Sequence, residues 1–295
     1  MYLALLALFL FIPPLYDGIE RKIRARLHSR VGPPSIMQTW YDIRKLFHKE
    51  LVATDTGANS IMVAAIFVAV TLFLALILPL GYTVLFSSDP VGLVLFTIML
   101  IASQLLWITL SLTPGNPYST IGVYREVVLG MVNEFFFALG LVGIMAYTRS
   151  LSFTRLRVAS ITLTYVLLII LLAIAAYVAS GRIPFDIAEA EPELASGVLI
   201  EFSGPVLGLM LYTHFLKRAI LYGLVIDLIL LPFTGIFGWV VGAILFFPLL
   251  LCLWMIYAVL SIVLARSRID MAPRTMFAIY LVFSMIILAS WILRV

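Results

Sequence analysis

The stretch ASITLTYVLLIILLAIAAYVA, residues 159–179, contains no charged side chain and decides the fold class of this chain. An α-helix rises about 1.5 Å per residue, so about 20 apolar residues cross the roughly 30 Å hydrocarbon core of a bilayer. Reading the whole chain in this way predicts an all-α, polytopic membrane protein. We expect about eight transmembrane helices, at residues 2–16, 60–86, 91–112, 121–147, 159–179, 205–231, 236–264 and 275–292.

The composition agrees with this fold class. Of 295 residues, 63% are hydrophobic and 12% are charged, and the mean hydropathy is +1.15. Such values are typical of polytopic membrane proteins, and no alternating pattern predicts a barrel. The first apolar run lacks a preceding basic region and a following cleavage site, so we interpret it as a retained span. We predict one integral membrane domain, residues 1–295, without a soluble domain or an internal repeat.

Charge distribution predicts the orientation. Residues 17–59 contain eight Lys and Arg residues, whereas residues 87–90 contain none. Links rich in Lys and Arg remain on the cytoplasmic side of a membrane, so we place the odd-numbered links in the cytoplasm. We expect the protein to lie in the cytoplasmic membrane of the cell. The fourth link, with Arg149, Arg155 and Arg157, runs against this trend. The only cysteine, Cys252, lies in an apolar run, which excludes an internal disulfide, and no Cys or His spacing predicts a metal site.

The first link predicts an amphipathic helix at the membrane surface. From Ile36 onward, Trp40, Ile43 and Phe47 lie near one helix face. Two interpretations are equally open, namely anchoring to anionic lipid headgroups and docking of a peripheral protein. The candidate docking residues are Glu20, Arg21, Arg24, Arg26, Arg30, Asp42 and Lys45.

Ionisable residues inside predicted spans suggest a proton or ion path. Such groups cost about 2.5–3.5 kcal/mol even on lenient scales, so they face a protein interior or a wet cavity. Glu134 lies mid-span, about 12 Å along the helix from Glu126. The sixth span carries three potential cations on one face and one acid, namely His214, Lys217, Arg218 and Asp227. Each group also has an alternative interpretation. Glu134 is then a protonated residue that packs against a neighbouring helix, Lys217 and Arg218 extend their charged ends toward the lipid headgroups, and His214 is a packing residue.

The link GRIPFDIAEAEPELASGVLIEFSGP, residues 181–205, is the most acidic segment. Its apolar ends and its glycines and prolines predict an irregular, partly buried segment at the membrane boundary. Carboxylates this close together share protons or bind a cation, although the spacing of a calcium loop is missing. The acids are Asp186, Glu189, Glu191, Glu193 and Glu201.

Four motifs in this order resemble a known family. They are ERKIRARLHSRVGPP (20–34), YDIRKLFHKE (41–50), YREVVLGMVNEF (124–135) and IPFDIAEAEPELASGVLIEFSG (183–204). They resemble the respiratory complex I subunit that carries the quinone chamber, and its relatives in energy-converting membrane-bound nickel–iron (NiFe) hydrogenases. The short link RVGPPSIMQ, residues 30–38, looks more like the hydrogenase branch. His214 stands where complex I relatives usually have glutamate.

The resemblance implies an eight-helix subunit that docks a peripheral electron-transfer arm and adjoins antiporter-like membrane subunits. It also implies that the residues matching Glu134, Glu191, Glu193 and Glu201 form a buried carboxylate path, with Arg125 nine residues before Glu134. With this resemblance we expect Glu134, Asp186, Glu189, Glu191, Glu193, Glu201, His214, Lys217 and Asp227 on the path, and Arg125, Glu126 and Arg218 in supporting ion pairs.

The leading interpretation is therefore a non-catalytic membrane subunit of an energy-converting hydrogenase, which couples redox chemistry to proton or sodium translocation. We expect the chain itself to bind no cofactor, with NiFe and iron–sulfur clusters in partner subunits. One alternative is a quinone-binding subunit of a complex I-type oxidoreductase. Others are a stand-alone proton-coupled transporter and a structural anchor. Protein subunits and lipid, rather than nucleic acid, are the expected partners.

Overall fold

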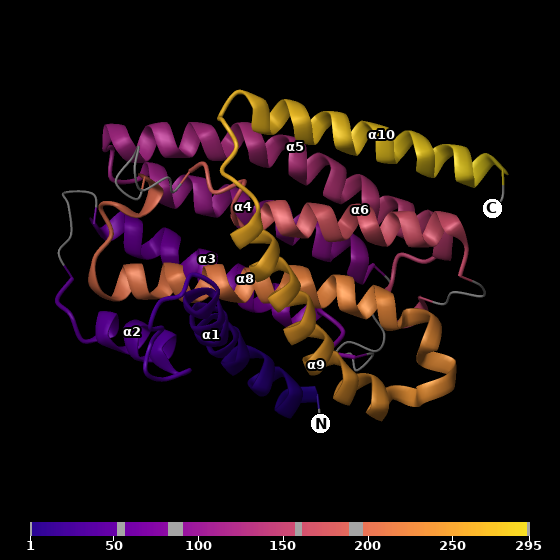
Figure 1. Cartoon of the computed structure of the whole chain (residues 1–295), viewed down its shortest axis with the longest axis horizontal. Helices are drawn as coiled ribbons and strands as arrows, with labels where there is room; N and C mark the ends of the chain where they lie inside the picture. Colours follow the sequence, from indigo (N-terminus) through magenta and orange to yellow (C-terminus); the bar gives the residue numbers. More distant parts are fainter. Residues whose placement is uncertain (1, 52–56, 82–90, 157–160, 189–196, 294–295) are drawn as a thin grey trace.

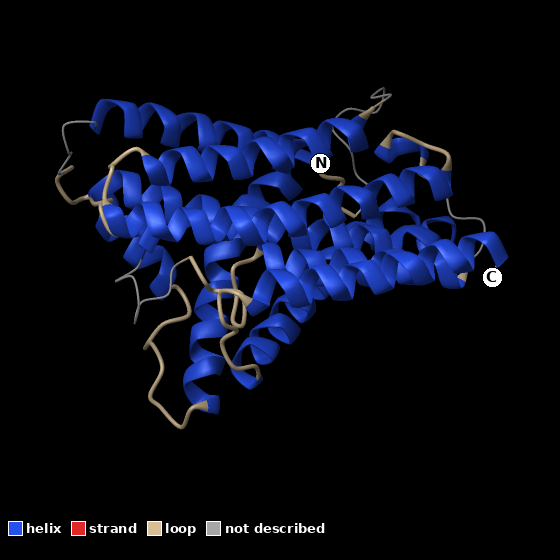
Figure 2. Ribbon diagram, turned by 90° about the horizontal axis from the view of Figure 1, so that it is seen from above, coloured by secondary structure: helices blue, strands red, loops and turns tan. Residues whose placement is uncertain are grey.

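The computed structural model describes residues 2–51, 57–81, 91–156, 161–188 and 197–293 as helices joined by links, without an extended strand among them (Figure 1 and Figure 2). The helices in chain order are α1 (Tyr2–Leu27), α2 (Gln38–Phe47), α3 (Gly57–Ile77), α4 (Gly92–Leu112), α5 (Pro117–Thr148), α6 (Leu163–Ala179), α8 (Gly204–Leu230), α9 (Thr234–Val263) and α10 (Met271–Leu293). Three short 3-10 turns, η1 (Phe153–Arg155), η2 (Gly197–Leu199) and η3 (Leu231–Phe233), lie in the links.

Six of the described helices are long and apolar enough to cross a membrane, namely α1, α3, α4, α5, α9 and α10. This confirms the predicted all-helical, multi-pass membrane protein. Helix α6 is apolar but has only 17 residues, whereas α8 has 27 residues and carries Lys217, Arg218 and Asp227. The predicted second span runs to residue 86, but α3 ends at Ile77 and residues 78–81 are not helical. Residues 82–86 of that prediction lie outside the described part of the chain.

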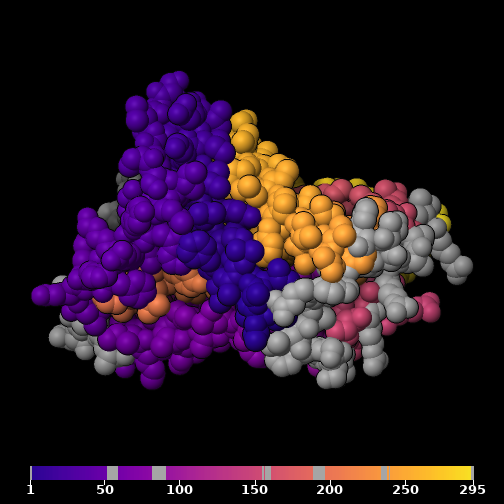
Figure 3. Space-filling model, turned by 90° about the horizontal axis from the view of Figure 1, so that it is seen from below, coloured from indigo at the N-terminus to yellow at the C-terminus, as the bar shows by residue number. Residues whose placement is uncertain are grey.

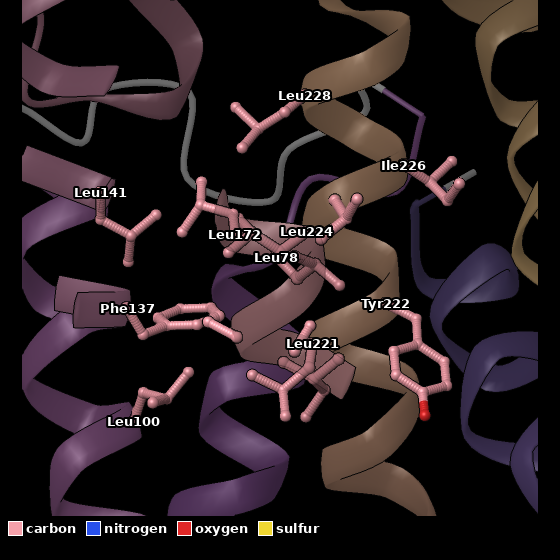
Figure 4. Close-up of a cluster of buried hydrophobic side chains, with 14 of the residues drawn as sticks. Leu78, Leu100, Phe137, Leu141, Leu172, Leu221, Tyr222, Leu224, Ile226 and Leu228 are labelled. Atoms are coloured by element: carbon pink, nitrogen blue, oxygen red, sulfur yellow. The ribbon is translucent and has the colours of Figure 1, made fainter. Parts of the chain in front are cut away.

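Helix α8 forms the centre of the bundle. It packs against α1, α2, α3, α6 and α9, and every residue from Ala219 to Leu228 is buried. Figure 4 shows Leu221, Leu224 and Leu228 of α8 among side chains from α5 and α6. Because neighbouring helices surround α8, its charged side chains face protein rather than lipid, which keeps them away from the costliest environment.

Helices α1 and α2 form one face of the molecule next to α9, as the indigo and orange surfaces in Figure 3 show. The link before α2 approaches α1 so closely that a Cβ added at Gly18 would lie 1.8 Å from the Ile36 carbonyl oxygen. Trp40 of α2 stacks on Phe11 of α1, with ring centroids 5.1 Å apart, and Ile43 is buried. The absence of a side chain at Gly18 therefore allows α2 to fold back onto α1 and α8.

Helix α5 begins next to Glu201, near the C-terminal end of the acidic link, because Asn116 before its first turn donates a hydrogen bond to the Glu201 carboxylate. Asn116 caps it by accepting a 2.8 Å hydrogen bond from the Tyr118 backbone N–H, and Pro117 suits a first helical turn. A Cβ added at Gly122 would lie 2.9 Å from the Ala188 carbonyl oxygen and 3.3 Å from the Val198 nitrogen. This close approach places Glu126, about one helical turn after Gly122, beside the described ends of the acidic link.

Candidate functional site

A chain of three side chains crosses the interior from α8 through α4 to α5. The Lys217 ammonium donates a hydrogen bond to Gln104 Oε1, and Gln104 Nε2 donates one of 2.8 Å to Glu126 Oε1. Lys217 and Gln104 are both 8% exposed. A cation and a carboxylate are therefore connected through a buried amide rather than by a direct ion pair.

Two small cavities adjoin these three side chains. The inner cavity is lined by Glu134 and Asn133, and the outer cavity by Asp186 and His214. Both are also lined by Lys217, Gln104 and Glu126, and each has a volume of about 30 Å³. A buried water needs about 10–15 Å³ and two to four polar partners, so each cavity has room for one or two waters. The cavities thus place polar groups in an interrupted row from Asp186 to Glu134.

Asp186 also faces the surface. Its carboxylate accepts a 2.6 Å hydrogen bond from Arg266 Nη2, and the side chain is 21% exposed. Asp186 and Arg125 help to line an open pocket of about 310 Å³ beside Arg268 and Asp270. Because Asp186 lines both this pocket and the outer cavity, it lies between the surface and the interior.

Arg218, which follows Lys217 in α8, donates its described hydrogen bonds to groups that carry no negative charge. Arg218 donates hydrogen bonds of 3.1 and 2.9 Å to the Ser180 carbonyl oxygen, and Arg218 Nη2 lies 2.9 Å from His214 Nε2. Arginine has only donors, so His214 Nε2 must accept, and the ring is neutral with its proton on Nδ1. The sequence predicted Arg218 in a supporting ion pair. Among the described residues, the hydrogen-bond partners of Arg218 are a carbonyl and an imidazole, and the partner of Lys217 is an amide.

A second polar cluster surrounds Glu20 in α1. Arg182 donates two hydrogen bonds of 2.6 Å to the Glu20 carboxylate, and Arg24 and Trp254 each donate one of 2.7 Å. Arg182 also donates a 3.0 Å hydrogen bond to the Tyr222 hydroxyl. Burial lowers the pKa of Arg182, but Tyr222 and Glu20 outweigh burial and raise it, so the guanidinium stays charged.

Glu20 itself is only 3% exposed. This differs from the expectation that Glu20 contributes to a docking surface, because its carboxylate is bound by this chain's own residues. A buried ion pair needs such additional hydrogen bonds to offset the desolvation of its charges. We therefore assign Glu20 to the junction of α1 with α9 and the α6–α8 link.

The remaining docking candidates lie at the surface. Arg21 donates a 2.7 Å hydrogen bond to Asp42, and their side chains are 44% and 45% exposed. Partial burial raises the pKa of Asp42, but hydrogen bonds from Arg21 and Gln38 and the charges of Arg21 and Lys45 hold it below its usual value. The exposed candidates are Arg21, Arg26, Arg30 and Lys45, and the partly exposed ones are Arg24 and Asp42.

Two predicted path residues lie apart from the cavities. Glu201 is half-buried and accepts a hydrogen bond from Asn116 Nδ2 at the start of α5. Asp227 is buried toward the other end of α8, about 15 Å along the axis from Lys217, and accepts a 3.1 Å hydrogen bond from the Gly81 N–H. The predicted path residues Glu189, Glu191 and Glu193 lie outside the described residues.

Sequence reasoning missed several members of these clusters. Gln104 is neutral, although a glutamine in the middle of the apolar run LIASQLLW was a signal of buried hydrogen bonding. Asp17 is buried and accepts a 2.8 Å hydrogen bond from Thr39, which joins α1 to α2. Trp254 and Tyr222 gave no signal, because aromatic residues in apolar helices are more often simple packing residues.

A bundle of apolar helices that encloses a row of charged and polar side chains defines a multi-pass membrane protein with an intramembrane polar path. Comparison with known proteins identifies the family of this chain. The sequence model described as NADH dehydrogenase matches residues 1–292, so the chain belongs to this family. This confirms the resemblance inferred from the four motifs.

Individual relatives come from both branches of the family. The chain is 35% identical to hydrogenase-4 component C of Escherichia coli (strain K12) over 240 residues, which cover 78% of this chain and 75% of that protein. It is 31% identical to formate hydrogenlyase subunit 4 of the same organism over 292 residues, covering 94% of each. A subunit of the NADH-quinone oxidoreductase of Rubrobacter xylanophilus is 28% identical over 245 residues, covering 75% of this chain and 73% of that protein.

A solved structure supports the fold. A chain of the membrane-bound sulfane sulfur reductase, an archaeal respiratory membrane complex, superposes with a TM-score of 0.82. The match covers 97% of both chains at 23% sequence identity, so it shows a shared fold.

Proposed function

We propose that this chain is the membrane subunit of a redox-driven, ion-translocating complex of the energy-converting membrane-bound hydrogenase type. The observation that carries this proposal is the row of groups from Asp186 through Lys217, Gln104 and Glu126 to Glu134, with two cavities beside it. Similarity to a hydrogenase component and a formate hydrogenlyase subunit supports this branch of the family.

The proposal includes eight spans in a single membrane domain, residues 1–295. Helix α6 is short, but its 17 residues carry no charge and cover about 26 Å, which a slightly thinned bilayer accommodates. Helix α8 keeps its charges inside the bundle, where Lys217 and Asp227 are buried. Helix α2 then lies in the membrane interface, since it packs on α1 and α8 and exposes Arg44 and Lys45.

Partner subunits carry the redox chemistry in this proposal. Iron–sulfur and NiFe clusters need several thiolate ligands, and this chain has one cysteine, Cys252. The clusters therefore reside in peripheral hydrogenase-like and iron–sulfur subunits, and antiporter-like subunits adjoin the chain in the membrane. We assign the contact with the peripheral arm to the exposed charges around α2, namely Arg21, Arg24, Arg26, Arg30, Asp42 and Lys45.

Within this chain the carboxylates hold and release protons or ions. Asp186 accepts them at the surface, and Glu126 and Glu134 hold them inside. Waters in the two cavities connect positions that side chains do not bridge directly. We retain Glu189, Glu191, Glu193, Glu201, His214 and Asp227 as further members of the path, with Arg125 and Arg218 as supporting charges.

A second candidate function is quinone binding in a complex I-type oxidoreductase, which similarity to the NADH-quinone oxidoreductase relative favours. The two candidate functions differ in the partner subunits and metals of the native complex, which can be measured directly. Purification of the native complex, followed by identification of its subunits and metals, tests both. Nickel together with hydrogenase-like subunits supports the hydrogenase type. Iron–sulfur subunits without nickel, with a quinone that crosslinks to this chain, support the second candidate. Purification of the chain alone, with transport activity in liposomes, would contradict both.

A further inference from the structure

We propose that the surface between α5, α10 and the link that joins α9 to α10 binds an anionic phospholipid. The phosphate headgroup lies on arginine side chains, and an acyl chain lies in an apolar groove beside them. This inference goes beyond the proposed function, which assigns no lipid site to the chain. The site consists of two adjoining open pockets, one polar and one apolar, and we call it the α5–α10 lipid site.

The two pockets form one continuous cleft. The polar pocket has a volume of about 310 Å³ and the apolar pocket about 360 Å³. Both are lined by the same four residues, namely Arg125, Ile187, Ile269 and Asp270. Each pocket is therefore within the range of about 300–1,000 Å³ that is usual for small-molecule sites. A ligand that fills both pockets must be polar at one end and apolar at the other.

Cations outnumber acids in the polar pocket. Arg125, Arg266 and Arg268 line it together with Asp186 and Asp270. Arg266 donates a 2.6 Å hydrogen bond to Asp186, so these two charges balance each other. Arg268 is exposed and takes part in none of the ion pairs between described residues. A guanidinium binds a phosphate through two parallel hydrogen bonds, so the polar pocket favours an anionic headgroup over a neutral one.

The apolar pocket opens on the side of a membrane span. Ile121, Tyr124 and Val128 are three and four residues apart, so they share one face of α5, and all three are exposed. Pro273, in the first turn of α10, lines the pocket from the other side. Helices α5 and α10 pack against each other along one edge of the bundle (Figure 1). Because both helices are apolar enough to cross a membrane, this groove faces lipid chains.

The arginines lie at the level where lipid headgroups are expected. Arg266 and Arg268 belong to the short link between the ends of α9 and α10, at Val263 and Met271, and both helices can span a membrane. Arg274, in the first turn of α10, adds another exposed guanidinium. Basic pockets between transmembrane helices bind anionic lipid headgroups. The adjoining groove favours a lipid over a free phosphate ion, because a free ion has no apolar part to place there.

Photo-crosslinking in the purified complex tests this inference. The complex is placed in nanodiscs of phosphatidylcholine that contain a trace of phosphatidylglycerol with a photoactivatable group in one acyl chain. Peptide mass spectrometry then compares labelling of residues 121–129 with labelling of residues 281–288, a part of α10 that lines neither pocket. A phosphatidylcholine probe with the same acyl chain shows the labelling that occurs without a negative headgroup.

The phosphatidylglycerol probe should label residues 121–129 about tenfold more than the phosphatidylcholine probe, because its headgroup adds a charge-assisted contact. Both probes should label residues 281–288 equally. Excess unlabelled phosphatidylglycerol should remove the preference, and inorganic phosphate should leave it unchanged. Equal labelling of residues 121–129 by the two probes would overturn the inference. Displacement by inorganic phosphate would instead indicate a site for a soluble anion, and absence of labelling by either probe would indicate that a protein partner covers the cleft.

Arg268→Gln tests the headgroup contact. Loss of the guanidinium should reduce the preference for phosphatidylglycerol by about tenfold, whereas Arg149→Gln, which changes an exposed arginine in another link, should retain it. An unchanged preference in Arg268→Gln would contradict the inference. If Arg268→Gln does not assemble, Val128→Trp replaces it, because a large side chain in the groove should also lower labelling by the phosphatidylglycerol probe. Redox-driven ion uptake by the same complex tests the proposed function separately.

Discussion

Arg182 and Glu20 form a buried ion pair with two parallel hydrogen bonds of 2.6 Å. The pair joins the link after α6 to the middle of the molecule, because Glu20 belongs to α1 and also binds Trp254 of α9. Arg182 opens the acidic link, four residues before Asp186. The ion pair therefore fixes one end of the segment that carries Asp186, the proposed path residue at the surface.

Breaking this pair should destabilise the protein strongly. Arg182→Leu leaves the Glu20 charge buried without its bidentate partner, and such losses cost about 3–5 kcal/mol. Chemical denaturation of the purified chain in detergent micelles measures the change. Arg21→Leu is the matched control, because the Arg21–Asp42 pair is exposed and such pairs contribute about 0–1 kcal/mol. Equal losses in the two variants would contradict the assigned role of Arg182.

The contact between α1 and α2 should not tolerate a side chain at Gly18. The methyl group of Gly18→Ala would overlap the Ile36 carbonyl oxygen, so the link before α2 must move. Overpacking of this kind costs about 1–3 kcal/mol, which a lowered midpoint of thermal unfolding reveals. Gly130→Ala is the control, since its methyl group would meet only Gln104 Nε2, at 3.5 Å. An unchanged midpoint in Gly18→Ala would show that the link adjusts without cost.

Acid should weaken the Arg21–Asp42 contact. The pKa of Asp42 is lowered in the folded state, so the Asp42 carboxylate makes its full contribution to stability above the usual aspartate pKa of about 3.9. This contribution disappears as the pH falls through the lowered folded-state pKa. Fluorescence of a variant that retains Trp40 as its only tryptophan, followed from neutral to acidic pH, reports the position of α2. Asp42→Asn should remove the acid-dependent component. A transition of the same size in Asp42→Asn would assign the effect to another group.

The exposed charges around α2 should distinguish docking from lipid anchoring. Replacing Arg26, Arg30 and Lys45 by glutamate reverses the charge of the surface and should release peripheral subunits from the membrane complex. Copurification with the tagged chain measures this release, and replacement of Arg149 in another link is the control. If the partners stay bound while the affinity for anionic vesicles falls, the surface is a lipid anchor instead.

Much of the fold could be predicted from the sequence, because apolar runs in lipid must form helices to satisfy the backbone. The observed helix ends differ from the predicted ones. Helix α3 ends at Ile77, well before the predicted residue 86, while α1 continues through charged residues to Leu27. Hydropathy does not detect a helix end that tertiary contacts determine.

The site was predicted in part. Charge within a span identified Glu134 and Lys217, because such residues are costly in lipid and need a polar environment. The partner of each cation was not predictable, since it depends on how helices distant in sequence pack. Gln104 and Lys217 are 113 residues apart, and the Glu20–Arg182 pair spans 162 residues. Glu20 stands in a basic motif that the sequence predicts to be exposed, yet the packing of α9 against α1 encloses it.

The most direct test of the central claim is redox-driven proton uptake by Glu134→Gln in the assembled complex, measured with a pH-sensitive dye in sealed vesicles. Electron transfer should continue while proton uptake falls by about tenfold or more, because the amide cannot hold the proton that Glu134 holds. Glu50→Gln, which changes an exposed glutamate, should behave like the unaltered protein. Proton uptake in Glu134→Gln at the rate of the unaltered complex would contradict the account.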